Sequence, residues 1–263
     1  MEATIRSLQL GMGWFPEQAG GLNRFYYHLL EHLPSVGVEV QGLVAGSPDV
    51  AKRTEGRVQA FAARTAPLPL RWLRARQAAS RLLGTQEIDL VCTHFALYAV
   101  SLADLVPPRP LVVHFQGPWA MESEVEGQNK FVVRIKHGVE HEVFRRAQRF
   151  ITLSEAFRQR LHKQYQVPLD RIVVGPGGVD VAAYATEGTR QDARERLGWP
   201  TDRPIVVAVR RLARRMGLEN LVEAMKAVCT AVPEALLLIA GKGPIKEELE
   251  AQIEALEIGR AHV

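Results

Sequence analysis

Short apolar runs alternate with longer segments of helical periodicity along almost the whole chain. The runs are rich in Val, Ile and Leu and show little polar alternation, which is typical of parallel strands covered on both faces. We predict strands at residues 4–10, 38–44, 57–62, 88–92, 111–115, 150–153, 171–174, 205–209 and 236–240. Because helical patterns lie between them, the alternation predicts a doubly wound α/β protein with Rossmann-like topology.

The helical segments carry their apolar residues on one face. In residues 21–33, Leu22, Phe25 and Leu29 recur at spacings of three and four. The same pattern predicts helices at residues 128–147, 155–165, 218–231 and 245–256. Ser154 stands immediately before one of them and is a suitable N-cap residue.

A domain boundary is predicted between residues 182 and 203. A glycine-rich turn, a polar helix at 190–197 and a loop precede a fresh β–α series that begins at Ile205. We therefore predict one Rossmann-like domain at 1–182 and a second at 183–263. Two predicted strands cannot bury both faces of a parallel sheet, so we expect the second domain to be incomplete in this chain. Residues 259–263 look like the approach to another strand.

Composition excludes several classes of protein. Of 263 residues, 47% are hydrophobic and 24% charged, as in an ordinary globular protein rather than a disordered one. A net charge of +4 is too small to argue for nucleic acid as a partner. The 2 cysteines, Cys92 and Cys229, exclude a disulfide scaffold and fit small core residues in a reducing compartment. Without a signal-peptide pattern or a long apolar segment, the sequence predicts a cytoplasmic protein.

A glycine-rich loop follows the first predicted strand. It runs over residues 11–21 and ends in Gly20 and Gly21, where the next helix begins. A helix N-terminus offers free N–H groups to phosphate or hydroxyl groups, but glycine is equally common in tight strand–helix turns. The spacing is not the dinucleotide fingerprint, because Pro16 stands where the third glycine belongs.

Two histidines stand at predicted strand ends. A histidine such as His114 can donate a hydrogen bond to a substrate hydroxyl or a departing oxygen. For a lone histidine, however, a hydrogen-bonded core role is the commoner one. For His94, in a similar position, we favour the core role.

Two further loops follow strands in the C-terminal part. Residues 209–218 hold four arginines, among them Arg211 and Arg215, and an arginine fork binds a diphosphate well. The alternative is a solvated basic loop. Gly241 and Gly243 flank a lysine in a strand–turn–helix pattern, but the full P-loop motif is absent. The sequence also lacks a D-x-D pair, H-E-x-x-H and G-x-S-x-G, which disfavours a metal-dependent nucleotide site, a zinc protease and a serine hydrolase.

Six segments in this order resemble family 4 glycosyltransferases of the GT-B fold. They are AGGLNRFYYHLLEHL, VVHFQGPW, FITLSEAFRQRL, VVGPGGVDVAAY, VRRLARRMGLENLVEAM and IAGKGPIKEELEAQI. The resemblance implies two Rossmann-like domains, an N-terminal one for the acceptor and a C-terminal one for a nucleotide-sugar donor. It also implies transfer with retention at the anomeric carbon, without a metal ion or other cofactor.

The resemblance assigns roles by motif position. Gly20 and Gly21 match the glycine loop near the donor phosphates and the acceptor, and His114 matches the histidine near the reacting sugar. Arg211 matches the arginine that neutralises the leaving diphosphate. Gly241 and Gly243 match a turn near the nucleotide. The family's usual lysine before Gly217 is Met216 here, and Arg215 or Arg214 is the candidate substitute.

Three alternatives stay open at this point. The chain is a truncated glycosyltransferase with little or no activity by itself, a fragment of a longer and fully active glycosyltransferase, or a non-catalytic module that binds an acceptor or partner. A Rossmann dehydrogenase is disfavoured by the missing fingerprint. Finally, residues 70–83 mix arginines with Trp72 and leucines, which suits either peripheral contact with an anionic membrane or a solvated helix face.

Overall fold

The computed structural model describes residues 4–256, 258 and 261–262, which form two compact units. One unit contains residues 1–121 and 129–178, and the other contains 122–128 and 179–263. The sequence-based boundary at 182/183 lies close to the third crossing of the chain between units, at 178/179. The helix α5 (Trp119–Val125) begins in the first unit and ends in the second.

The first unit is built on a seven-stranded sheet in which every neighbouring pair is parallel. The strand order is β3-β2-β1-β4-β5-β6-β7. The strands are β1 (Ile5–Gly13), β2 (Val38–Ala45), β3 (Val58–Ala62), β4 (Leu90–Thr93), β5 (Leu111–Phe115), β6 (Arg149–Thr152) and β7 (Ile172–Val174). The order reverses direction between β1 and β4, and such a switch point is where ligands bind in open α/β sheets.

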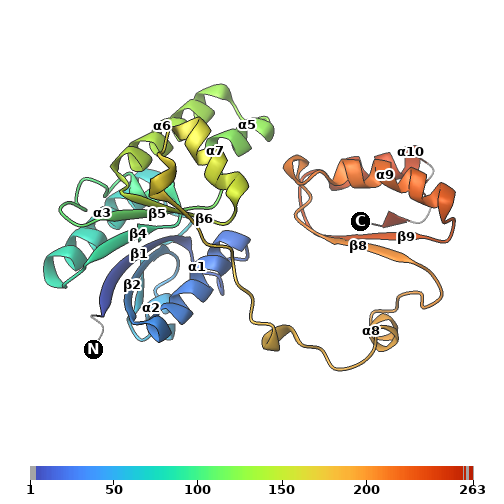
Figure 1. Cartoon of the computed structure of the whole chain (residues 1–263), viewed down its shortest axis with the longest axis horizontal. Helices are drawn as coiled ribbons and strands as arrows, with labels where there is room; N and C mark the ends of the chain where they lie inside the picture. The colour runs from blue at the N-terminus through green and yellow to red at the C-terminus, as the bar shows by residue number, and fades with distance from the viewer. Residues whose placement is uncertain (1–3, 257, 259–260, 263) are drawn as a thin grey trace. The chain divides into compact units, whose positions relative to one another are not determined.

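Helices cover both faces of this sheet (Figure 1). They are α1 (Gly21–His32), α2 (Asp49–Arg53), α3 (Leu68–Thr85), α4 (Ala96–Ala99), α6 (Lys130–Arg146) and α7 (Glu155–Tyr165). Alternation along β2 shows the two layers, because Leu43 belongs to the core under α3 while Val44 belongs to the core under α1. Ser154 caps α7 as predicted, its side chain accepting from the Phe157 N–H.

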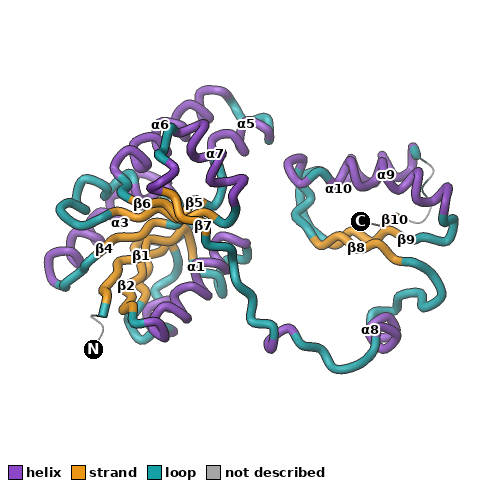
Figure 2. Tube along the Cα trace, in the orientation of Figure 1, coloured by secondary structure: helices purple, strands orange, loops and turns teal. Residues whose placement is uncertain are grey.

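The second unit holds a three-stranded parallel sheet in the order β10-β9-β8. Its elements are α8 (Arg190–Arg196), β8 (Ile205–Val209), α9 (Leu218–Ala231), β9 (Leu236–Ala240), α10 (Lys246–Ala255) and β10 (Ala261–His262). The tube view separates these strands and helices clearly (Figure 2). Leu212, Val222, Leu237 and Leu249 form its core. The predicted approach to a third strand is confirmed by β10, although residues 259, 260 and 263 lie outside the described part.

Most sequence-based elements match closely, and α7 and α9 have the predicted bounds. The pattern missed three short helices, α2, α4 and α5, because four to seven residues are too few to show helical periodicity. No helix in the described part of the chain is both long and apolar enough to cross a membrane.

Candidate functional site

The loop after β1 leaves the start of α1 open. Gly20 has φ 149°, a left-handed conformation that favours glycine, and it occupies the N-cap position of α1. No side chain in the described residues caps this end, and the first turn contains no acidic residue. A Cβ at Gly21 would meet nothing within 4 Å. The first N–H groups of α1 therefore have no competing acceptor from a capping side chain.

Parallel register brings His94 and His114 together beside this helix. Thr93 of β4 pairs with Val113 of β5, so the residues that follow them stand side by side. The two imidazole rings stack with centroids 4.3 Å apart and planes 12° from parallel. Phe25 of α1 lies 5.9 Å from the His114 ring, which links the glycine loop's helix to the histidine pair.

A chain of hydrogen bonds fixes the protonation of His94. The Ser7 hydroxyl donates to the Glu39 carbonyl at 3.1 Å, so its oxygen accepts from Gln9 Nε2, also at 3.1 Å. The Gln9 Oε1 atom is then an acceptor, and it lies 3.0 Å from His94 Nε2. Since a carbonyl oxygen cannot donate, His94 must carry its proton on Nε2.

Burial keeps both imidazoles neutral. The pKa of His114 is lowered to about 4 because the ring is buried, and only 8% of the residue is exposed. The pKa of His94 is lowered well below its usual value, first by burial and then by the charge of His114. The predicted core role of His94 is confirmed in its burial and its Nε2 hydrogen bond. The sequence did not reveal that it stacks against His114.

Several buried polar atoms near the carboxyl ends of β1, β4 and β5 lack hydrogen-bond partners. Among the described residues these are His94 Nδ1, His114 Nδ1, Gln116 Nε2 and Asn23 Oδ1. Buried polar groups are normally paired, so unpaired ones at a switch point mark places for a polar ligand. Sequence reasoning missed Asn23 and Gln116, although their positions in the first turn of α1 and just after β5 were visible signals.

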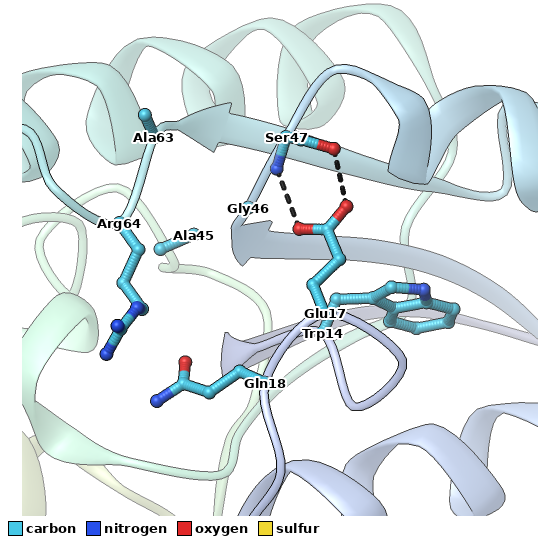
Figure 3. A pocket seen from close by; sticks show the side chains of 8 residues that line it. All are labelled: Trp14, Glu17, Gln18, Ala45, Gly46, Ser47, Ala63 and Arg64. Atoms are coloured by element: carbon cyan, nitrogen blue, oxygen red, sulfur yellow. Dashed lines mark hydrogen bonds between the residues drawn. The ribbon is translucent and has the colours of Figure 1, made fainter.

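A pocket of about 210 Å³ opens beside this region, at the carboxyl ends of β1, β2 and β3 (Figure 3). It is lined by Trp14, Glu17, Gln18, Ala45, Gly46, Ser47, Ala63 and Arg64. The Glu17 carboxylate accepts from the Ser47 N–H at 2.9 Å and from the Ser47 hydroxyl at 2.5 Å. This pair ties the loop after β1 to the loop after β2.

The four-arginine loop of the second unit has one arginine without a partner among the residues that the structure describes. Arg214 forms an ion pair with Glu248 at 2.7 Å. Arg215 pairs with two carboxylates of the same unit, Glu122 at 3.1 Å and Glu126 at 2.8 Å. Arg210 contacts the sulfur of Met216 at 3.6 Å. For the exposed Arg211 side chain, no hydrogen bond or ion pair is found within the described part of the chain.

Gly241 and Gly243 pack against that arginine loop. A Cβ at Gly241 would lie 1.8 Å from the Arg210 carbonyl oxygen, and one at Gly243 would lie 2.0 Å from the Leu212 carbonyl oxygen. Both distances are far shorter than any van der Waals contact, so neither position accepts a side chain unless the backbone moves. Backbone bonds hold the close approach, with the Leu212 N–H donating to the Lys242 carbonyl at 3.1 Å. These glycines therefore fix the backbone that carries Arg211.

The candidate residues fall into two groups, each gathered within its own unit. Gly20, Gly21 and His114 lie at the carboxyl edge of the seven-stranded sheet. Arg211, Arg215, Gly241 and Gly243 lie at the carboxyl ends of β8 and β9. Among the described residues, no three His, Cys, Asp or Glu side chains gather in a metal-binding cluster.

Comparison with known families decides the classification. The model of Glycosyltransferase Family 4 matches residues 19–183, and that of Glycosyl transferases group 1 matches residues 189–263. The chain belongs to glycosyltransferase family 4. Both of its units are Rossmann-like, as the GT-B fold class requires.

Individual relatives match parts of this family 4 chain. Alpha-D-kanosaminyltransferase of Streptomyces kanamyceticus is 30% identical over 118 residues, which are 44% of this chain and 30% of that protein. A GDP-mannose-dependent phosphatidylinositol monomannoside mannosyltransferase of Corynebacterium glutamicum is 37% identical over 76 residues, 28% of this chain and 20% of that protein. The matched segments thus span less than a third of these curated relatives.

A solved structure supports the fold over almost the whole chain. The Anabaena protein Alr3699/HepE, crystallised with UDP and glucose, aligns with a TM-score of 0.69 at 19% sequence identity. The alignment covers 98% of this chain and 68% of the Anabaena chain.

The amphipathic segment at 70–83 is largely engaged within the first unit. Leu82 and Leu83 are buried, and the Trp72 indole donates to the Leu97 carbonyl at 2.6 Å. Arg76 pairs with Asp104 at 2.6 Å. These residues pack α3 against the rest of the unit and are not available to a membrane. This favours a solvated helix face over membrane contact for the rest of the segment.

Proposed function

We propose that this chain forms part of a retaining, metal-independent hexosyltransferase. It moves a sugar from a nucleoside-diphosphate sugar to a glycan, lipid or small-molecule acceptor. The first unit binds the acceptor, and the second binds the donor's nucleotide and diphosphate. Family membership and the fold shared with a protein crystallised with UDP and glucose support this assignment.

The observation that carries the proposal is the Arg211 guanidinium, which is unpaired among the described residues. Its three neighbours contact a carboxylate or a sulfur atom, whereas the Arg211 side chain has no partner in the described residues. An uncompensated arginine on a loop held rigid by two glycines is suited to bind an anion. Breaking the sugar–phosphate bond leaves negative charge on the diphosphate, which such a group stabilises.

The other candidate residues have roles that fit their geometry. The open N-terminus of α1, after Gly20 and Gly21, supplies N–H groups to phosphate or hydroxyl oxygens. His114, neutral near pH 7, exchanges hydrogen bonds with sugar hydroxyls rather than acting as a cation. Gly241 and Gly243 shape the part of the second unit that binds the nucleotide. Arg215 is a weaker contributor than Arg211, because two carboxylates already compensate its charge.

Nucleotide binding gives the direct test. Titration calorimetry of the chain with UDP, GDP and ADP identifies the base, and Arg211→Ala is expected to weaken binding of the preferred diphosphate by about tenfold or more. Lys226→Ala is the matched control, since it removes a positive charge from an exposed side chain of α9 in the same unit but outside the arginine loop. Equal binding by wild type and Arg211→Ala would remove the proposed role of Arg211.

Sugar transfer itself is tested with a panel of UDP-, GDP- and ADP-hexoses. Release of nucleoside diphosphate in the presence of acceptors is the expected result. Acceptor binding without any donor breakdown would instead identify the chain as a non-catalytic binding fragment.

Peripheral membrane contact stays a separate prediction. Exposed Leu70, Leu73, Arg74 and Arg81 are the part of the 70–83 segment still able to reach an anionic surface. Absence of sedimentation with anionic vesicles at low salt would exclude it.

A further inference from the structure

The pocket across the first three strands has two chemically different sides. Glu17 and Ser47 form one side, and small residues such as Ala45 and Ala63 leave room beside them. Away from Ser47, the side chains of Gln18 and Arg64 extend toward one another (Figure 3). Its volume of about 210 Å³ is smaller than the roughly 300–1,000 Å³ of a typical drug-sized site. The pocket therefore suits one ring rather than a whole nucleotide sugar.

The Glu17 carboxylate is held ready to accept more hydrogen bonds. Each of its oxygens already accepts one bond from Ser47, at 2.9 and 2.5 Å. A carboxylate has about four acceptor positions, so about two remain for a ligand. Because Ser47 fixes its orientation, little side-chain entropy is lost when hydroxyl groups bind.

Two glycines make space for the polar side chains of this pocket. A Cβ at Gly46 would lie 3.0 Å from Glu17 Oε2, and a Cβ at Gly13 would lie 2.7 Å from Gln18 Oε1. Neither glycine has a positive φ, so space rather than backbone conformation explains them. The loops after β1 and β2 are thus shaped around Glu17 and Gln18.

Arg64 supplies a positive charge that has no ion-pair partner among the described residues. It is exposed and lies two residues after the end of β3, and no hydrogen bond or ion pair joins it to another residue that the structure describes. Figure 3 shows the whole Gln18 amide group, oxygen and nitrogen, on the side of the pocket that Arg64 also lines. The Arg64 guanidinium and the Gln18 amide both line the pocket and can donate hydrogen bonds to a ligand there. The cation selects a negatively charged acceptor.

We propose that this pocket binds an acceptor ring that carries both hydroxyl groups and an anionic substituent. Glu17 accepts hydrogen bonds from the hydroxyls, and Arg64 with Gln18 binds the phosphate or carboxylate. The inference rests on the proposed function in assigning the ligand as the acceptor. It adds the charge class of that acceptor and makes Arg64 the residue that selects it.

The test compares three ligands with the same ring and different charge. Glucose 6-phosphate, glucose and glucosamine are titrated into the chain without any nucleotide sugar, and backbone amide NMR shifts report the affinity and the site. We expect glucose 6-phosphate to bind about fivefold more tightly than glucose, as one partly screened charge pair allows. Glucosamine is expected to bind less tightly than glucose 6-phosphate, and the shifts to centre on residues 13–18, 45–47 and 63–64.

Variants separate the two sides of the pocket. Arg64→Ala should abolish the preference for the phosphate while leaving glucose binding unchanged. Glu17→Gln should lower the affinity for glucose and for glucose 6-phosphate by a similar factor. Arg81→Ala, which removes an exposed arginine of α3 outside the pocket, should keep the wild-type preference.

Three results would overturn the proposal: no binding of any of the three ligands, equal affinity for glucose and its phosphate, or shifts centred elsewhere. Because no donor is present, these results do not depend on transfer. If the anionic ligand is preferred but no nucleotide binds, the pocket assignment stands and the transferase proposal fails. If a nucleotide binds but the anionic ligand is not preferred, only the pocket assignment fails.

Discussion

The imidazole rings of His94 and His114 stack 4.3 Å apart at the carboxyl ends of neighbouring strands. His94 is the deeper of the two, and Gln9 holds it in one tautomer through Nε2. The face of His114 therefore rests on a ring whose orientation is set by backbone-anchored hydrogen bonds. This support gives the candidate sugar-binding histidine a defined position before any ligand is present.

The tautomer of His94 can be tested through Gln9. In Gln9→Leu, the buried His94 N–H loses its acceptor, which should lower the free energy of unfolding by about 1–3 kcal/mol. The imidazole proton should then distribute over both ring nitrogens, as long-range proton–nitrogen NMR would detect. Gln59→Leu, on β3 of the same sheet, is the control. An unchanged Nε2–H signal in Gln9→Leu would contradict the hydrogen-bond chain.

Stability should fall in mild acid because His114 resists protonation. The unfolded chain takes up a proton at this residue near pH 6.5, whereas the folded chain does so only at the lowered pKa of about 4. Between those values the unfolded state binds more protons, so the free energy of unfolding decreases by about 1.4 kcal/mol per pH unit as pH falls. The contribution is fully present above pH 6.5.

Urea unfolding at pH 7.5 and 5.0 measures this effect. His114→Phe should show a smaller loss of stability between the two pH values than the wild type. His28→Gln, which replaces an exposed histidine of the same unit, is the control. Identical losses in wild type and His114→Phe would show that the ring is not kept neutral by burial.

Glu140 holds the start of α5 in place. Its buried carboxylate accepts from the Trp119 N–H and the Tyr165 hydroxyl, each at 2.8 Å, and from the Ala120 N–H at 3.4 Å. Burial raises the pKa of this carboxyl group, and the hydrogen bonds oppose that rise. Glu140→Ala should lower the free energy of unfolding by about 3 kcal/mol, because it leaves these buried donors unpaired.

The neighbouring Glu142 provides the control for this substitution. It lies on the same helix and pairs with Arg145 at the surface, so Glu142→Ala should change stability by no more than about 1 kcal/mol. Denaturant unfolding compares the two. Equal effects would show that Glu140 is not a structural carboxylate.

The arginine loop should depend on the glycine packed beneath it. Gly243→Ala places a methyl group 2.0 Å from the Leu212 carbonyl, so the loop must move, at a cost of about 3 kcal/mol or more. Amide hydrogen exchange should accelerate across residues 210–213. Gly177→Ala is the matched control, since nothing lies within 4 Å of its added Cβ and its φ is not positive. Unchanged exchange in Gly243→Ala would contradict the packing argument.

Local pattern determined much of this protein in advance. The spacing of apolar residues predicted α7 and α9 with their observed bounds, and strand runs such as 111–115 and 236–240 matched β5 and β9. Both signals depend only on neighbours along the chain, where periodicity shows which side of an element is buried. The order of six motifs also indicated glycosyltransferase family 4, which the family match confirmed.

Only the tertiary structure decided how distant residues combine. Strand register placed His94 against His114. The packing of loops paired Arg214 and Arg215 with carboxylates, whereas Arg211 has no partner in the described part of the chain. Such pairings depend on strand order, on register and on side chains far apart in sequence, none of which local periodicity encodes. The sequence by itself determined the elements and the family, whereas long-range packing decided which of their polar groups are neutralised and which stay available for a ligand.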